Sequence, residues 1–493
     1  MTSLYLAREI RALEARAPAG VSLMERAGRA VAELASGLAA ETGEAILVVA
    51  GEGNNGGDAW VAADRLRESF HRVTVLDAGK GEPAATEARA AKSRFVAGGG
   101  EVVREWPERL QPALIIDGLL GIGLSRDVQG RYATHVDQIN HANALVLAID
   151  VPSGLDANTG AVRGSAVRAD HTITFLAAKP GLYTGDGLDH AGQVHVDTLG
   201  ITPPAETLHG TLLSPDALRG WLAPRSRNSH KGSFRTLGVV GGTRGMAGAA
   251  LIAARAGLFA GAGKVYVGLL AETLAYDPGA PELMLRSVDD TLEADVIVAG
   301  PGAGLSPSAT SRSTFERSTL PTIIEMEKPI VLDADALNAI AVQDALQASL
   351  QARTLPAILT PHPGEAARLL RSTIAEVQRD RIGAAVALAK KYNAHVVVKG
   401  AGSVCATPHG EWSINATGNP GLASGGTGDA LAGLIGAMLC QGLAPGRALA
   451  YAVCLHGAAA DACVAQGTGP TGLTATDVIL AARRVLNDWI QVS

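Results

Sequence analysis

The sequence reads Asn415-Ala-Thr-Gly-Asn-Pro-Gly-Leu-Ala-Ser-Gly-Gly-Thr-Gly-Asp429 in a glycine-rich segment that runs directly into the apolar helical pattern of residues 430–439. Small residues let the backbone approach a ligand closely, and the N-terminus of a helix presents unpaired N–H groups to an anion. Asp429 lies where that helix begins. A carboxylate there can take a proton from a hydroxyl while the amides hold a transferring phosphoryl group. The segment therefore predicts a phosphoryl-transfer site.

The composition of the chain indicates a soluble α/β protein of two domains. Its 493 residues exceed one ordinary core, and 47% are apolar and 18% charged. Aromatic residues make up only 4%, the net charge is -6 and no Lys/Arg run occurs, which argues against nucleic-acid binding. The four cysteines lack any disulfide or zinc spacing, so we expect reduced, buried thiols. The first ten residues carry charges where a signal peptide needs an apolar core, and charges interrupt the longest apolar runs. We expect a cytoplasmic protein with no membrane partner.

The first two-fifths of the chain alternates short apolar runs with helical patterns. Such alternation predicts a parallel sheet covered by helices on both faces. A capping box at residues 22–25 opens a helix that extends through residue 38. The expected strands are residues 44–50, 72–76, 113–117 and 144–150, and the expected helices between them are residues 57–69, 84–97 and 132–141.

A proline-marked, polar stretch near residues 205–225 predicts a domain boundary. We therefore expect a first domain over residues 1–210, a linker over 211–225 and a second domain over 226–493. The α/β pattern restarts after the boundary. Its expected strands begin at residues 236, 264, 296, 330, 357 and 395.

Polar residues cluster at the expected strand ends of the first domain. Residues 51–58 form a loop rich in glycine and asparagine between a strand and a helix, and Asp117 and Asp150 each end a buried strand. Parallel strands bring these ends to one sheet edge, where doubly wound folds bind ligands. The oxygens of Asn55, Asp117 and Ser153 carry little charge together, which suits a monovalent cation better than Mg²⁺ or Zn²⁺. Asp58 has the alternative role of a helix cap.

Three segments of this domain, taken together, resemble the NAD(P)H-hydrate epimerase family. They are Asn54-Asn-Gly-Gly-Asp58, Asp117-Gly-Leu-Leu-Gly-Ile-Gly-Leu124 and Asp150-Val-Pro-Ser-Gly-Leu-Asp-Ala157. The resemblance implies a Rossmann-like three-layer αβα domain that interconverts the R and S hydrates of NADH and NADPH. It implies K⁺ bound by Asn55, Asp117 and Ser153, and a catalytic Asp150 at the reacting nicotinamide. The implied hydrate-binding residues are Asn54, Asn55, Gly56, Gly57, Asp58, Gly121, Ile122, Gly123, Leu124, Ser125, Arg126, Asp127 and Asp150. Ala59 stands where the family usually has glycine, and its methyl group is expected to crowd the loop.

Further segments of the second domain follow or precede expected strands, and we expect them all at one sheet edge with residues 425–429. They are His230-Lys-Gly-Ser-Phe234, Gly300-Pro-Gly-Ala-Gly304, Thr360-Pro-His-Pro-Gly-Glu365 and Lys399-Gly-Ala-Gly-Ser403. Lone glycine motifs usually mark turns, but the full set predicts a functional site. Asp333 and Asp335 are expected to cap the helix near residue 337 or to support the site. His456 and Cys454 lie on an apolar helical pattern and are expected in the core.

This domain resembles the ribokinase-like fold and, more narrowly, the NAD(P)H-hydrate dehydratase family. The resemblance rests on residues 300–304, 331–338, 359–366, 398–403 and 418–429, and His362 stands where general kinases of this fold usually have asparagine. It implies a three-layer αβα domain that uses ADP, with Mg²⁺ near Glu365. The implied hydrate contacts are Gly304, His362 and Asp429, and the implied ADP contacts are Lys399, Gly400, Ala401, Gly402, Ser403 and Gly428.

The two resemblances together imply a bifunctional enzyme that repairs the NADH and NADPH hydrates, and we expect it to be a homo-oligomer. Asp429 would deprotonate the ring hydroxyl of the S hydrate, and the terminal phosphoryl group of ADP would be transferred to it. Two alternatives stay open. One is a small-molecule kinase, such as a hydroxymethylpyrimidine or thiazole kinase, with a binding-only first domain. The other is a first domain that only senses a ligand or oligomerises.

Overall fold

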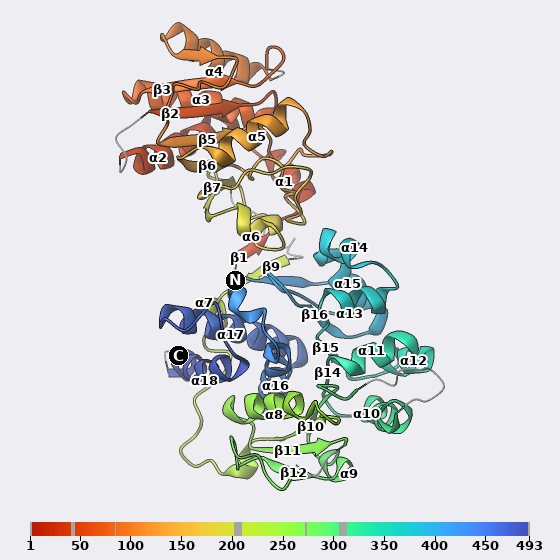
Figure 1. Cartoon of the computed structure of the whole chain (residues 1–493). Helices are drawn as coiled ribbons and strands as arrows, with labels where there is room; N and C mark the ends of the chain where they lie inside the picture. The colour runs from red at the N-terminus through yellow and green to blue at the C-terminus, as the bar shows by residue number, and fades with distance from the viewer. Residues whose placement is uncertain are drawn as a thin grey trace. The chain divides into compact units, whose positions relative to one another are not determined.

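The computed structural model of the chain describes residues 2–40, 45–83, 85–201, 210–271, 274–304 and 313–491. It divides into two compact units, residues 2–210 and residues 211–493 (Figure 1). The segment 211–225, whose composition suggested a linker, contributes to β9 (Gly210–Leu213) and forms α7 (Pro215–Leu218). Leu213, Leu218 and Leu222 are buried in the core of the second unit. These leucines attach the segment to that unit, although its prolines and arginines read as linker composition.

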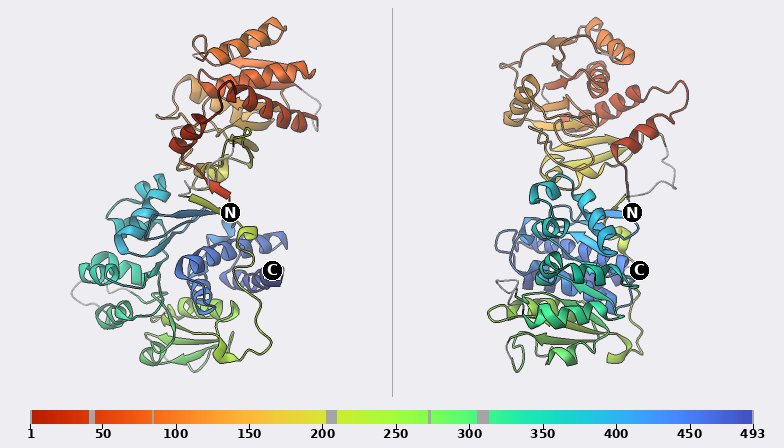
Figure 2. Two further views of the ribbon diagram at one scale, coloured as in Figure 1. Left: turned by 180° about the vertical axis from the view of Figure 1, so that it is seen from behind. Right: turned by 90° about the vertical axis from the view of Figure 1, so that its right-hand side faces the viewer.

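The sheet of the first unit is parallel between all paired strands that the structure describes there, with strand order β4-β3-β2-β5-β6-β7-β8. Ile46 and Val48 face a core with α2, α3 and α4, whereas Leu47 and Val49 face a core with α5. This alternation places helices on both faces of the sheet (Figure 2). The strands are β2 (Ile46–Ala50), β3 (Val73–Asp77), β4 (Glu101–Val103), β5 (Leu114–Gly118), β6 (Leu145–Ile149), β7 (His171–Phe175) and β8 (Gln193–Asp197); the helices are α1 (Ala7–Glu14), α2 (Leu23–Ala40), α3 (Asn54–Glu68), α4 (Thr86–Ala97), α5 (Arg131–His141) and α6 (Gly187–His190).

The strand order of this sheet reverses between β2 and β5. The chain proceeds from β2 to β3 and β4 on one side, and from β5 to β8 on the other. The loops after β2 and β5 therefore lead to opposite faces and leave a crevice between them, which is where doubly wound sheets bind ligands.

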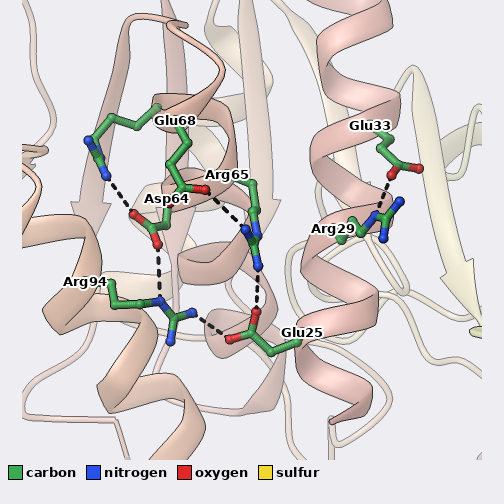
Figure 3. A network of polar contacts seen from close by, with 8 residues as sticks. Glu25, Arg29, Glu33, Asp64, Arg65, Glu68 and Arg94 are labelled. Atoms are coloured by element: carbon green, nitrogen blue, oxygen red, sulfur yellow. Dashed lines mark hydrogen bonds and ion pairs between the residues drawn. The ribbon is translucent and has the colours of Figure 1, made fainter. Parts of the chain in front are cut away.

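Three helices on one face of this sheet are joined by ion pairs (Figure 3). Arg94 of α4 contacts Glu25 of α2 at 2.6 Å and Asp64 of α3 at 3.3 Å, and Arg65 of α3 also reaches Glu25. Because most of these side chains are partly exposed, each pair contributes little, and the apolar layer beneath supplies most of the stability.

The sheet of the second unit follows the same plan. Its strand order is β9-β18-β17-β16-β15-β14-β13-β10-β11-β12, and the order reverses between β10 and β13. β17 pairs antiparallel with β16 and with β18. The pairs among β10 to β16 are all parallel. Helices α8, α16, α17 and α18 share one core with the sheet. Helix α10 packs against β13, and α15 packs against β16. The strands are β10 (Thr236–Gly241), β11 (Lys264–Leu269), β12 (Met284–Arg286), β13 (Val296–Ala299), β14 (Ile330–Leu332), β15 (Ile358–Leu359), β16 (His395–Val398), β17 (Val404–Ala406) and β18 (Trp412–Asn415); the helices are α8 (Ala247–Phe259), α9 (Val288–Thr291), α10 (Leu320–Glu325), α11 (Asp335–Val342), α12 (Asp344–Gln351), α13 (Pro363–Leu370), α14 (Ile374–Arg379), α15 (Arg381–Tyr392), α16 (Thr427–Cys440), α17 (Pro445–Ala465) and α18 (Ala475–Gln491).

The α/β architecture with two three-layer domains is thus confirmed, as is the burial of the four cysteines as free thiols. One half of the predicted capping box at residues 22–25 is present, because Ser22 Oγ accepts from Glu25 N–H at 3.1 Å, whereas the Glu25 carboxylate pairs with Arg94 and Arg65. Among the described helices, α17 alone has the length and apolarity to cross a bilayer, but 72% of its most apolar window is buried within the unit. That burial is typical of a core helix.

Candidate active sites

A cavity of about 1110 Å³ opens at the reversal point of the first sheet. Two glycines next to it permit close packing. A Cβ on Gly51 would lie 2.1 Å from Leu119 O in the loop after β5, and one on Gly56 of α3 would lie 2.0 Å from Gly51 O. The cavity brings together most of the predicted hydrate-binding residues. Those on its wall are Asn54, Asn55, Asp58, Gly121, Ile122, Gly123, Leu124, Ser125, Arg126, Asp127 and Asp150. Gly56 and Gly57 are buried in the first turns of α3 behind this wall.

The three predicted cation ligands are linked through Leu120, next to the cavity wall that carries Asn55. Asp117 is fully buried, and its carboxylate accepts from Ser153 N–H at 2.8 Å and from Ser153 Oγ at 2.7 Å. Leu120 O accepts from Asn55 Nδ2 at 2.9 Å and Leu120 N–H donates to Ser153 Oγ at 2.8 Å. Burial raises the pKa of Asp117 to about 6, against the hydrogen bonds that favour its charged form. The cluster is one carboxylate among neutral oxygens, and this donor set fits a monovalent cation.

Asp150 is held by a lysine that the sequence analysis did not single out. Lys179 is fully buried, and its Nζ contacts Asp150 Oδ1 at 2.8 Å, Thr174 Oγ1 at 2.7 Å and Phe175 O at 3.0 Å. These three acceptors occupy all three ammonium protons. The other oxygen, Asp150 Oδ2, accepts from Ile122 N–H at 3.3 Å. Asp150 also has a φ of 66°, a strained value for a residue other than glycine, which is typical of functional positions.

Two further carboxyl groups face the same cavity. Glu14, at the end of α1, and Asp58 both line it. Burial and the charge of Asp150 raise the pKa of Asp58 well above its usual value and raise that of Glu14 as well. Asp58 lies inside α3, whose N-cap is Gly53, so the alternative role as a helix cap is wrong. Ala59 is fully buried, and its Cβ points at Gly118, 2.5 Å from where a Cβ on that glycine would be. Its methyl group therefore packs in the core.

The reversal point of the second sheet is built from two touching loops. Gly242 N–H donates to Pro301 O at 2.9 Å and Thr243 N–H donates to Gly302 O at 2.7 Å. The first of these loops, residues 241–246, was not predicted as part of a site. Its glycines follow an expected strand and are typical of an ordinary strand end. Gly304 has a φ of 71° and donates its N–H to Asp335 Oδ2 at 2.8 Å. Asp335 thus shapes the predicted hydrate-binding loop.

Asp429 lies in the first turn of α16, where the glycine-rich segment ends. Burial raises its pKa to about 6, and nearby Asp333 adds to the shift while Lys399 opposes it. Lys399 Nζ pairs with Asp333 Oδ1 at 2.9 Å, and a Cβ on Gly428 would lie 3.2 Å from that Nζ. Burial lowers the pKa of Lys399, but the carboxylates of Asp333, Glu365 and Asp429 outweigh it and raise the pKa overall. The site therefore places a cation and a carboxylate of raised pKa beside the open N-terminus of a helix.

His362 and Glu365 form a reciprocal cap at the start of α13. Glu365 Oε2 accepts from His362 N–H at 2.8 Å, and His362 Nδ1 accepts from Gly364 N–H at 2.9 Å. Because Nδ1 is an acceptor, the proton of a neutral imidazole lies on Nε2, which faces Glu365 Oε1 at 3.5 Å. Burial and the charge of Lys399 lower the pKa of His362, while burial raises that of Glu365. The lowered pKa favours the neutral form of His362, in which Nε2 is the hydrogen-bond donor.

The segment of residues 399–403 turns sharply between β16 and β17. Ser403 Oγ donates to Gly400 O at 3.0 Å and accepts from Gly400 N–H at 3.2 Å, and Gly400 and Gly402 have positive φ. Ala401 lies between them. The hairpin thus presents backbone next to Lys399.

One expectation about this edge is wrong. Residues 230–234 precede β10, and a Cβ on Gly263, just before β11, would lie 2.4 Å from Phe234 O. They therefore lie at the N-terminal edge of the parallel strands, opposite Asp429, because a segment that precedes a strand cannot reach its far end. His456 and Cys454 are buried, as expected, and burial lowers the pKa of His456 to about 4.

Comparisons with known proteins match both halves of the chain. A family described as NAD(P)H-hydrate dehydratase matches residues 237–483, and one described as YjeF-related protein N-terminus matches residues 20–181. The bifunctional NAD(P)H-hydrate repair enzyme of Coxiella burnetii is 38% identical over 99% of this chain and 100% of its own length. Its counterpart from Escherichia coli is 39% identical over 90% of this chain and 85% of its own length.

Solved structures match part of the chain. An ADP/ATP-dependent NAD(P)H-hydrate dehydratase from Bacillus subtilis, co-crystallised with ATP and Mg²⁺, is 29% identical and covers 57% of this chain and 98% of that one, with a TM-score of 0.48. A ribokinase-like superfamily protein from Enterococcus faecalis is 25% identical over 59% of this chain and 100% of that one, with a TM-score of 0.49.

Proposed function

Because the chain belongs to the family of bifunctional NAD(P)H-hydrate repair enzymes, we propose that it repairs hydrated NADH and NADPH with a separate site in each unit. The first unit epimerises the R and S hydrates, and the second dehydrates the S form. Either activity alone would leave half of the damaged cofactor unrepaired. The alternative of a vitamin-precursor kinase with a binding-only first unit is disfavoured, because relatives over the full length are named as repair enzymes.

The cavity of the first unit has the chemistry that epimerisation of a ring carbinol needs. We assign the reacting nicotinamide to Asp150, whose carboxylate lines the cavity while Lys179 fixes its other side. The remaining cavity residues from 54–58 and 121–127 bind the rest of the hydrate. A general base must keep its orientation while the substrate changes, and the saturated Lys179 ammonium supports that orientation.

We further propose that K⁺ binds between Asn55, Asp117 and Ser153. A divalent metal is disfavoured at this site, because Asp117 is the one charged group among its three ligands. A bound monovalent cation would fix the loop after β5, which carries Gly121. Epimerase activity measured across a K⁺ titration in a choline background tests this assignment.

In the second unit, Asp429 takes the proton of the ring hydroxyl, and the freed oxygen attacks the terminal phosphoryl group of ADP. AMP leaves, and the hydroxyl has become a phosphate ester. The ring nitrogen lone pair then expels phosphate from carbon, and loss of a proton from the adjacent ring carbon restores the reduced nicotinamide. Lys399 and the amides at the start of α16, including Gly428, stabilise the charge on the transferring group. Lys399, Gly400, Ala401, Gly402 and Ser403 bind ADP, and Gly304 and His362 orient the hydrate.

Mg²⁺ is expected near Glu365, where it would neutralise phosphate charge. Glu365 Oε2 accepts from His362 N–H and Oε1 lies 3.5 Å from His362 Nε2, so contact with the ion through water fits this arrangement. We also propose that the protein is a homo-oligomer, which light scattering tests.

The observation that carries the dehydratase assignment is the placement of Asp429, of raised pKa, in the first turn of α16 beside Lys399. Phosphorus NMR of a reaction with the S hydrate, ADP and Mg²⁺ tests it. One AMP and one phosphate are expected per reduced nicotinamide formed. Accumulation of a stable phosphorylated product would support the kinase alternative.

A further inference from the structure

One carboxylate of α17 holds the start of the glycine-rich loop that leads to Asp429. Asp461 Oδ2 accepts from Gly418 N–H at 2.8 Å, and Asp461 Oδ1 accepts from Asn419 Nδ2 at 2.9 Å. Within the described part of the chain, no basic side chain forms an ion pair with Asp461. Both carboxylate oxygens therefore serve donors of the loop.

The backbone of Gly418 explains why this support comes from outside the loop. Its φ is 111°, a value that side-chain-bearing residues rarely adopt. The preceding residue is anchored to the same helix, because Thr417 Oγ1 donates to Cys454 O at 2.9 Å. A Cβ on Gly457 would lie 2.3 Å from Thr417 Oγ1, so loop and helix are in close contact. Asp461 thus continues an anchor that begins at Thr417.

A series of hydrogen bonds connects the contacts of Asp461 with Gly418 and Asn419 to the N-terminus of α16. Asn419 Oδ1 accepts from Gly421 N–H at 3.0 Å. Ser424 Oγ lies 3.0 Å from Gly421 O and 2.7 Å from Leu473 O, and Thr427 Oγ1 lies 2.9 Å from Ser424 O and 2.8 Å from Leu422 O. Thr427 is the first residue of α16, two residues before Asp429. The path from Asp461 to the proposed phosphoryl site therefore consists of polar contacts within hydrogen-bond distance and one short stretch of backbone.

We propose that Asp461 is a positioning residue for the nucleotide, which acts through Asn419 by fixing residues 418–428 with their amides directed at the phosphoryl group. The proposal rests on the dehydratase function proposed above. Amides that converge on an anion repel one another when the anion is absent, so a loop of this kind needs rigid support to stay ready for the ligand. The two bonds to Asp461 supply that support at the entry of the loop.

Exchanging the two side chains gives a direct test. In Asp461→Asn, the new amide sets a donor against the donor of Asn419, and in Asn419→Asp two carboxylates face each other. In the double variant D461N/N419D, the amide at 461 accepts from Gly418 N–H and donates to the carboxylate at 419, which still accepts from Gly421 N–H. The hydrogen-bond pattern is restored with its polarity reversed.

We expect each single variant to raise the KM for ADP about tenfold or more while kcat changes much less, as loss of bonds to a charged group predicts. The double variant should recover most of the KM. Asp295→Asn serves as the matched control. Asp295, just before β13, also accepts from a backbone N–H, that of Thr236 at the start of β10 at 2.7 Å, but it does so at the opposite sheet edge. Its KM should stay at the wild-type value.

The proposal is overturned if D461N has the wild-type KM for ADP, or if the double variant is no better than N419D. It is also overturned if all three variants lose thermal stability in proportion to activity, because Asp461 would then serve folding alone. Wild-type protein in the same assay distinguishes failure of the positioning role of Asp461 from failure of the proposed dehydratase function. If it forms no reduced nicotinamide with any nucleotide, the proposed function fails, whatever the variants show.

Discussion

Replacing Lys179 by methionine should disable the first unit and spare the second. Methionine has a similar length but leaves Asp150, Thr174 Oγ1 and Phe175 O without the ammonium that each contacts within 3.0 Å. At 2.8 Å and an effective dielectric constant of about 20, the Coulomb attraction to Asp150 is roughly 6 kcal/mol before desolvation is subtracted. Breaking one side of a buried pair typically costs about 3–5 kcal/mol. We expect the free energy of unfolding of the first unit to fall by an amount in that range, because Lys179 is fully buried.

Hydrogen exchange with mass spectrometry, read on peptides from β6 and β7, reports the opening free energy of this region. The epimerase and dehydratase rates of the same sample report the two sites. Arg29→Met removes the cation of an exposed pair with Glu33 in the same unit and should leave both readouts unchanged. In the double variant D150N/K179M the exchange should recover in part, because both charges are gone. If K179M behaves like R29M, the structural role argued for the lysine is wrong.

Further predictions concern both sites. Asp429→Asn should lower the dehydratase kcat about 10²-fold or more and leave epimerase activity intact, which coupled assays on one preparation can check. Because the pKa of Asp429 is about 6 and the base must be charged, dehydratase kcat/KM should fall about tenfold per pH unit below 6 in a pH profile. That raised pKa also means that ionisation costs stability as pH rises through 6, so D429N should raise the melting temperature at pH 7 but not at pH 4. Gly428→Ala should raise the KM for ADP, since the new methyl would lie 3.2 Å from Lys399 Nζ. Ser153→Ala should raise the K⁺ concentration needed for half-maximal epimerase activity about tenfold, measured by K⁺ titration.

Much of the fold follows from local patterns, and the departures have physical causes. Strand–helix alternation predicts the strands from β2 to β6, apart from β4, and parallel pairing then brings their glycine-marked ends together. β7 escaped prediction because its Thr172 and Thr174 interrupt the apolar run. Both are buried, with Thr172 Oγ1 donating to Ala191 O and Thr174 Oγ1 accepting from Lys179 Nζ. Lys179 follows β7, so its pairing with Asp150 was hidden for the same reason.

The residues that support the sites were harder to predict than the residues that line them. Gly304, His362 and Lys399 carry motif signals in their own segments. Asp461 carries none, because its role depends on the packing of α17 against a loop more than forty positions earlier in the chain, a separation that no local pattern reports. Glu14 likewise reaches the first cavity from an ordinary amphipathic helix.

The most direct test of two activities in one chain uses a mixture of R and S NADH hydrates with ADP, Mg²⁺ and K⁺, followed by the absorbance of reduced nicotinamide. Wild-type protein should return all of the hydrate to NADH. With D150N the fast phase should end near half recovery, and the rest should follow only at the rate of spontaneous epimerisation. D429N should return none, and equal amounts of D150N and D429N should together restore full recovery. Full recovery at the wild-type rate by D150N alone would contradict an epimerase in the first unit, and recovery by D429N alone would contradict the site at α16.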